Sequence, residues 1–163
     1  MTFPDKNQLR QAILAQLDAD LQLLQRAAQT AYEAATHEEN IAENKYDTLG
    51  LEASYLATGQ ARRVEELRQA HRAFQQLVLR PFEAKRGIQL GALVSLSDTQ
   101  GIRQWLFLGP DGAGVRVGQP PQQVTVITPR SPLGQRLLGK QLGDELELTI
   151  NRLQQRFEIV QVC

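Results

Sequence analysis

The spacing of apolar residues changes near residue 81, and this change limits what the chain can fold into. Residues 5–80 contain only two glycines and lie between Pro4 and Pro81. In the first part of this segment, apolar positions recur at steps of three and four residues, which is the a/d pattern of a coiled coil. These positions are Leu14, Leu17, Leu21, Leu24, Ala28, Ala31 and Ala35. The pattern predicts a long helix that buries one stripe against a partner helix.

A second series with the same spacing occupies the rest of the segment. Its members are Tyr46, Gly50, Ala53, Ala57, Gln60, Val64, Leu67, His71, Phe74 and Val78. Small residues lie at the adjoining ends of the two series and large residues at their far ends. We therefore predict an antiparallel coiled-coil hairpin over residues 1–80, with helices at about 5–36 and 42–79 and a tip at about 37–43. Helices of this length extend about 50 Å, and Pro81 ends the second one.

Beyond Pro81 the apolar residues alternate with period two, as in half-buried strands. The segments with this period are 90–98, 104–109, 114–118, 123–128, 145–150 and 156–162. Between the fourth and the fifth, Ser131 is a candidate N-cap, Pro132 suits the first helical position and Gly139 suits the end of a short helix. Residues 81–163 are therefore predicted to form a small, mostly antiparallel β domain with one short helix, and the fold class of the chain is α+β.

Composition limits the partners and the compartment. With 18 Lys and Arg against 18 Asp and Glu, the formal net charge is zero, so no global basic field attracts nucleic acid. The single cysteine, Cys163, cannot form an internal disulfide, and no Cys/His spacing suggests a zinc site. The charged start of the chain lacks an apolar leader segment, and no apolar run is long enough for a membrane span. We expect a cytoplasmic monomer without membrane contact.

The predicted tip is rich in acids. The stretch HEENIAENKYDT (37–48) contains His37, Glu38, Glu39, Asn40, Glu43 and Asp47. An acid-rich helical turn is usually a solvated surface, and Asp47 also suits the dipole at the start of the second helix. On composition alone solvation is the simpler interpretation, and the alternative is that these acids take part in chemistry.

The segment ITPRSPLGQRLLGKQLGDELEL (127–148) resembles the signature of the bacterial Gre transcript-cleavage factors. In that signature a Ser-Pro-hydrophobic-Gly stretch precedes a Leu-Leu-Gly-Lys turn and a Gly-Asp pair that enters a strand. The matching residues are Ser131, Pro132, Leu133, Gly134, Leu137, Leu138, Gly139, Lys140, Gly143 and Asp144. The order of a long hairpin followed by a β domain agrees as well. The resemblance implies an FKBP-like fold for the C-terminal domain.

The resemblance also implies a partner. Gre factors bind RNA polymerase with the C-terminal domain at the rim of the secondary channel, and Ser131, Pro132, Leu133 and Gly134 are the expected contacts here. The acidic tip reaches the polymerase active centre, where it helps to hold a second Mg²⁺ and a water that hydrolyses a backtracked RNA 3′ end. One or two protein carboxylates commonly hold Mg²⁺ while other ligands come from elsewhere. Such a factor shares an active site with the polymerase, so it is no enzyme by itself and binds no cofactor tightly alone.

The tip departs from the family pattern at one position. The family reads approximately Asp-Leu-Ser-Glu-Asn, with the Asp and the Glu as the metal-assisting pair. The corresponding residues here are Asn40, Ile41, Ala42, Glu43 and Asn44. Glu43 fits its role, Asn40 brings an uncharged amide, and Glu39 supplies a carboxylate if the loop rotates. Accessory candidates at the tip are Glu38, His37 and Asp47.

Two functions follow from this departure. The leading hypothesis is a factor that occupies the channel and modulates transcription elongation without cutting RNA, and the alternative is one that stimulates Mg²⁺-dependent cleavage of backtracked RNA. A coiled-coil adaptor unrelated to transcription is a lesser alternative. A prolyl isomerase is disfavoured, because Trp105, Phe107 and Phe157 are expected in the core rather than in an open pocket.

Two features of the second helix have structural explanations. Its arginines are Arg62, Arg63, Arg68 and Arg72. Glu65 and Glu66 lie at pairing distance from them, so a salt-bridged solvent face is predicted rather than an RNA-binding face. His71 lies on the apolar stripe and is predicted to be a semi-buried structural histidine.

Overall fold

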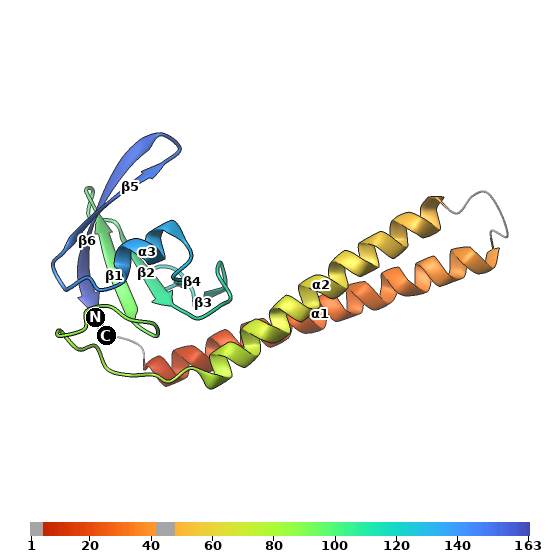
Figure 1. Ribbon diagram of the computed structural model, residues 1–163, viewed down its shortest axis with the longest axis horizontal. Coiled ribbons are helices and arrows are strands. Elements are labelled where there is room, and N and C mark those ends of the chain that lie inside the picture. Colours follow the sequence, from red (N-terminus) through yellow and green to blue (C-terminus); the bar gives the residue numbers. More distant parts are fainter. Residues whose placement is uncertain (1–4, 42–47) are drawn as a thin grey trace. The chain divides into compact units, whose positions relative to one another are not determined.

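Figure 1 shows the computed structural model of the chain, which describes residues 5–41 and 48–163, with side chains described outside residues 35–57. In this part of the chain two long helices, α1 (Lys6–Ile41) and α2 (Thr48–Gln76), precede six strands and a short helix. The α+β fold class is therefore confirmed. The chain divides into two compact units, Leu17–Gln69 and Met1–Gln16 together with Ala70–Cys163.

The unit Leu17–Gln69 consists of paired helical segments with a narrow apolar stripe. Leu17, Ala31, Val64 and Leu67 are buried, and Leu21, Leu24 and Gln60 are half-buried. These residues are members of the two series with steps of three and four. The hairpin predicted from that spacing is thus confirmed where side chains are described.

The helix ends differ from the prediction. Helix α1 continues through Ile41, so residues 37–41 are helical although they were expected to belong to the tip. Helix α2 ends at Gln76 rather than near Leu79. The Leu77 carbonyl instead accepts a hydrogen bond of 2.7 Å from Arg10 Nη1, and the Arg80 carbonyl accepts one of 2.6 Å from Lys6 Nζ. These two cations from α1 satisfy carbonyls where α2 gives way to an irregular segment.

At the base of the hairpin the buried positions also shift. Ile13 is fully buried whereas Leu14 is half-buried. Phe74 is fully buried as expected, but Val78 is 63% exposed, so its assignment to the apolar stripe is wrong. The reason is that the helical period ends with α2, after which Leu77 points inward and Val78 outward.

The second unit contains a six-stranded sheet in the order β3-β4-β2-β1-β6-β5. The strands are β1 (Leu93–Asp98), β2 (Arg103–Leu108), β3 (Arg116–Val117), β4 (Val124–Ile127), β5 (Glu145–Ile150) and β6 (Leu153–Val162). Each corresponds to a predicted segment, and the sheet is mostly antiparallel as predicted, with one parallel pair formed by β2 and β4. The chain reverses twice between them, and β3 pairs antiparallel with β4, so β4 runs in the same direction as β2.

The two faces of this sheet bury different residues. On the face toward α3 (Pro132–Leu137), the core includes Val94, Leu96, Leu106, Leu108, Leu137, Leu146, Phe157 and Ile159. Strand alternation places Phe107 on the opposite face, where its ring centroid lies 6.0 Å from that of Phe74 in α2. Trp105, Phe107 and Phe157 are all buried, which confirms that these aromatic residues belong to the core.

No helix within residues 5–41 and 48–163 has a stretch that is long and apolar enough to cross a membrane.

Candidate functional site

The acidic residues expected at the tip lie largely beyond the described structure. Glu43 and Asp47 fall in the segment 42–47, outside the described residues. His37, Glu38, Glu39 and Asn40 have helical backbone near the end of α1, and their side chains are likewise outside the description. Where side chains are described, no group of three or more His, Cys, Asp or Glu residues is arranged to hold a metal ion. The roles of the tip residues and of Mg²⁺ therefore stay predictions.

The Ser-Pro turn before α3 is held by two hydrogen bonds of one hydroxyl. Ser131 Oγ accepts a bond of 3.0 Å from the Gly134 N–H and donates one of 2.8 Å to the Thr128 carbonyl. Ser131 is the N-cap of α3, with φ −72° and ψ 153°, and Pro132 occupies the start of the helix. This confirms the predicted cap. The Ser131 hydroxyl thus connects the residue before the turn, Thr128, to the first turn of α3 at Gly134.

The four residues expected to contact a partner differ in accessibility. Pro132 is exposed, Ser131 and Leu133 are half-buried, and Gly134 is buried. Leu133 packs against the core on the α3 face. A Cβ on Gly134 would overlap the Thr128 carbonyl oxygen, so only glycine fits this close approach. Ser131 and Gly134 define the shape of the turn, and Pro132 is the member that a partner can reach most directly.

Leu138 and Leu142 extend the accessible apolar surface beyond α3. They are 40% and 59% exposed, respectively. Between them the chain turns at Gly139, whose φ is +79°, and this confirms the predicted helix end. Large exposed apolar side chains on a rigid turn are suited to contact with another protein.

The segment before β1 is tied to this turn. The Gly139 N–H donates to the Ile88 carbonyl and the Ile88 N–H donates to the Lys140 carbonyl, each at 2.8 Å. Gln141 Nε2 donates a further bond of 2.6 Å to the Ala84 carbonyl. This link, residues 80–87, is therefore an ordered part of the unit.

The arginines of α2 behave as predicted for a solvated face. Arg63 pairs with Glu66 at 3.1 Å and Arg68 with Glu65 at 3.9 Å, and all four side chains are more than half exposed. His71 is half-buried, which agrees with a structural histidine. Exposed ion pairs of this kind contribute little to stability.

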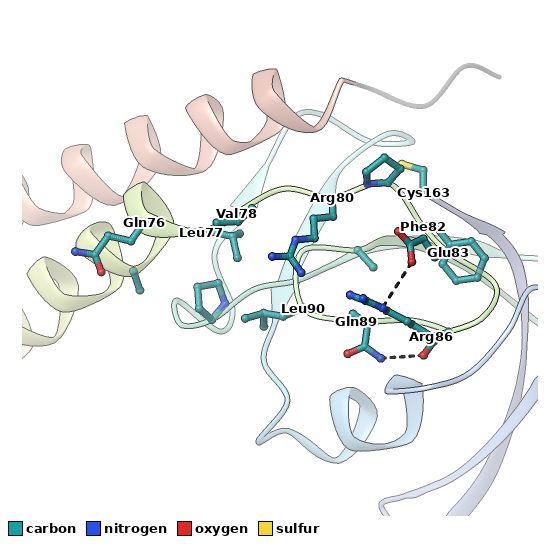
Figure 2. Close-up of a pocket in the computed structure, with 15 residues that line it drawn as sticks. Gln76, Leu77, Val78, Arg80, Phe82, Glu83, Arg86, Gln89, Leu90 and Cys163 are labelled. Atoms are coloured by element: carbon teal, nitrogen blue, oxygen red, sulfur yellow. Dashed lines mark hydrogen bonds and ion pairs between the residues drawn. The ribbon is translucent and has the colours of Figure 1, made fainter.

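A pocket of about 530 Å³ lies where the chain leaves α2 (Figure 2). Its apolar lining includes Leu77, Val78, Pro81, Phe82, Leu90 and Ala92. Its charged lining consists of Arg80, Glu83 and Arg86, and the Arg86 guanidinium lies 3.6 Å from the Glu83 carboxylate. Cys163 also lines the pocket. All of these residues belong to the same compact unit.

Cys163 and Lys6 have perturbed pKa values. Burial raises the pKa of the Cys163 thiol, and the nearby Lys6 ammonium lowers it by a smaller amount. Burial likewise lowers the pKa of Lys6, while Cys163 opposes that change. In both cases partial removal from water disfavours the charged form.

The sequence interpretation missed this pocket. The three-four spacing assigns Val78 to the apolar stripe, and the alternation assigns Leu90 to the strand segment 90–98. The available signal was that the apolar residues Val78 and Leu90 flank a short, charged, proline-containing segment. Periodicity accounts for both residues in the sequence, yet both side chains are exposed in the structure.

Along the chain, a helical hairpin is followed by a domain with a six-stranded sheet and one short helix. Residues 83–163 match the family model described as "Transcription elongation factor, GreA/GreB, C-term". Through this domain the chain belongs to the GreA/GreB family.

Solved structures of Gfh1 proteins are similar to the chain over most of its length. "GreA factor homolog 1 (Gfh1)" of Thermus thermophilus is 23% identical, with 93% of this chain and 95% of that chain covered and a TM-score of 0.39. A structure of "the transcription factor Gfh1" is 26% identical, with 93% of each chain covered and a TM-score of 0.40. Gfh1 of Thermus aquaticus is 25% identical, with 93% and 94% covered and a TM-score of 0.38. A search of curated proteins finds no match.

Proposed function

We propose that this chain binds bacterial RNA polymerase at the secondary channel and modulates transcription elongation there. The observation that carries the proposal is the GreA/GreB C-terminal domain at residues 83–163. A long helical hairpin precedes this domain, as expected for a factor that inserts a coiled coil into a channel.

The C-terminal domain provides the docking surface in this proposal. Pro132, Leu138 and Leu142 present accessible apolar groups around a turn that Ser131 holds rigid. A rigid apolar patch binds with little loss of conformational entropy. Leu142→Asp is expected to weaken polymerase binding at least about tenfold, the loss typical of a buried contact residue. Leu153→Asp is the matched control, because Leu153 is a similarly exposed leucine at the start of β6.

The composition of the tip favours occupancy of the channel without cleavage. Asn40 offers an amide oxygen, which is a possible ligand for a hard cation but adds no negative charge. Glu39 and Glu43 are carboxylates of the type that Mg²⁺ prefers, and two carboxylates alone do not make a complete site. Mg²⁺, held mainly by the polymerase, would supply Lewis-acid chemistry, while this chain supplies the hairpin, the carboxylates and the docking surface. The chain is no enzyme by itself in this proposal.

The second candidate function is stimulated cleavage of backtracked RNA. It is favoured by Glu43, which keeps a carboxylate at the position that matches the family's metal-assisting Glu, and by Glu39 beside Asn40. In this case Glu38, His37 and Asp47 would adjust the charge around the RNA 3′ end.

One assay separates the two candidates. A polymerase complex is stalled with labelled, backtracked RNA, the protein is added with Mg²⁺, and both binding and short 3′ fragments are measured. Tight binding without fragments supports the leading proposal, and fragments that disappear in Glu43→Ala support the second. Glu33→Ala is the control, because Glu33 is an exposed acid of α1 upstream of the expected tip.

Two further variants test the tip within the same assay. Asn40→Asp restores the family carboxylate and is expected to create or increase cleavage. If the native chain already cuts RNA, Glu39→Gln shows whether Glu39 substitutes for the missing Asp. Absence of polymerase binding by the native chain would overturn both candidate functions and favour a coiled-coil adaptor.

A further inference from the structure

The pocket beside the end of α2 combines an apolar wall with the guanidinium of Arg80. Val78 and Leu90 line it and are 63% and 41% exposed, so apolar surface is left open to solvent there. The volume of about 530 Å³ falls in the range of roughly 300–1,000 Å³ typical of small-molecule sites. Phe82 and Pro81 add further apolar lining.

Among the side chains that line this pocket, cations outnumber acids. Arg86 is paired with Glu83, and Glu83 is the one acidic residue that contributes to the lining. Arg80 also lines the pocket, and no acid pairs with its guanidinium within the described ranges 5–41 and 48–163. Figure 2 shows the contrast: a dashed line joins Arg86 to Glu83, whereas none reaches the Arg80 guanidinium near Val78 and Leu90. The Lys6 ammonium, bonded to the Arg80 carbonyl, adds a second positive charge nearby.

We propose that this pocket binds a small apolar carboxylate, whose anionic head pairs with Arg80 and whose apolar body contacts Val78 and Leu90. A guanidinium can hold a carboxylate through two parallel hydrogen bonds. An apolar body gains free energy by covering the exposed surface of the two aliphatic residues. The site differs from both the predicted acidic tip and the turn before α3, so it does not depend on the proposed function.

Cys163 makes the pocket experimentally accessible. It is the single cysteine of the chain, it lines the pocket and its thiol is half-buried. A ligand in the pocket therefore blocks reagents from reaching a single, chemically unique atom. Loss of thiol reactivity on ligand addition reports binding at this place rather than elsewhere on the surface.

The test uses the full chain and decanoate as the probe, below its micelle concentration, with 1-decanol as the neutral counterpart. Binding is measured by calorimetry, and occupancy by the rate at which N-ethylmaleimide alkylates Cys163. We expect decanoate to bind, to slow alkylation, and to bind about tenfold more weakly to Arg80→Gln, the loss expected when a charged hydrogen-bonded partner is removed. Arg103→Gln is the matched control, an exposed arginine at the start of β2, and it should bind as the native chain does.

A second pair of variants keeps the proposal testable if Arg80→Gln does not fold. Leu90→Ser removes part of the apolar wall and should also weaken decanoate binding, whereas Ile102→Ser changes an exposed residue of the β1–β2 turn and should not. Equal affinity for decanoate and 1-decanol, unchanged affinity in both Arg80→Gln and Leu90→Ser, or alkylation that decanoate does not slow would each overturn the proposal.

Discussion

The Arg10 guanidinium in α1 donates a 2.7 Å hydrogen bond to the Leu77 carbonyl, directly beyond the end of α2. The bond is partly buried, and the same guanidinium also donates to Asn7 Oδ1 at 3.2 Å. A residue in the first turns of one helix thereby fixes where the chain departs from the other. The carbonyl would otherwise have to find water in a partly buried position.

Arg10→Ala is therefore expected to lower the free energy of unfolding by about 1.5–3 kcal/mol, the range for a hydrogen bond that involves a charged group. Urea unfolding followed by circular dichroism measures the change. Arg26→Ala is the control, because Arg26 is an exposed arginine of the same helix and its replacement should change stability by less than about 0.5 kcal/mol. Equal stability of the two variants would contradict the assigned role of Arg10.

Two glycine substitutions should have effects of opposite sign. A Cβ at Gly134 would overlap the Thr128 carbonyl oxygen, so Gly134→Ala should destabilise the C-terminal domain by about 1–3 kcal/mol or more through overpacking. A Cβ at Gly59 meets no atom within 4 Å, and Gly59 lies inside α2. Gly59→Ala should therefore stabilise the chain by about 0.5–1 kcal/mol. Thermal unfolding of both variants measures the two shifts in one experiment.

Phe74 is expected to contribute more to stability than any exposed residue near it. It is fully buried against Phe107, and a Cβ on Gly109 would lie only 2.6 Å from its Cζ atom, so the site is tightly filled. Phe74→Ala should cost about 3–5 kcal/mol of unfolding free energy. Val78→Ala, at a position that shares the same sequence spacing but is exposed, should cost less than about 0.5 kcal/mol. Similar losses in both variants would mean that Val78 is buried after all.

The reactivity of Cys163 should depend on pH in a direction set by its surroundings. Burial raises the pKa of its thiol in the folded chain, so at a mildly alkaline pH less thiolate is present than in the unfolded chain. Alkylation should be slower in the native chain than in urea. Because the folded-state pKa is the higher one, the stabilising contribution is complete below the unfolded-state pKa and is lost as the pH rises through the folded-state pKa.

Lys6→Gln tests the effect of the Lys6 ammonium on the pKa of the Cys163 thiol, which is smaller than the effect of burial. The Lys6 ammonium lowers the pKa of Cys163, so its removal should move the midpoint of the alkylation profile to higher pH. Lys85→Gln is the control, because Lys85 is an exposed cation of the link. A midpoint that moves to lower pH in Lys6→Gln, or moves equally in both variants, would show that the assigned electrostatic influence is wrong.

Periodicity predicted the elements whose burial repeats regularly. The three-four spacing located both long helices, and alternation located all of the strands described in residues 93–162. The cap at Ser131 followed from local chemistry, because a hydroxyl before proline satisfies an orphan N–H at a helix start. Such features depend on neighbours in sequence, which is why a single sequence reveals them.

The features that the sequence did not predict depend on residues distant in the chain. The end of α2 is set by Arg10 and Lys6, which lie 67 and 74 positions from their acceptors. The parallel pairing of β2 with β4 results from two chain reversals that alternation cannot register. The pocket is lined by the end of α2, the link, Pro110 and Cys163. Because these segments are distant in sequence, no local sequence pattern predicts the pocket. The sequence motif likewise includes Ser131 and Gly134, but it does not show that the Ser131 hydroxyl bonds within the turn and that Gly134 packs against the Thr128 carbonyl.

The approach of Gly87 to Gly139 has a consequence for protein engineering. A Cβ at Gly87 would overlap the backbone of Gly139, and Gly87 has a φ of +70°. The link and the turn after α3 are therefore one structural cassette, although more than fifty positions separate them in the chain. A chimaera joined to another hairpin between Gly87 and β1 would bring in a foreign link that has to fit this narrow contact. A junction placed before Glu83 transfers Gly87 and the turn at Gly139 together. The exchanged domain then keeps its native contact between these two segments.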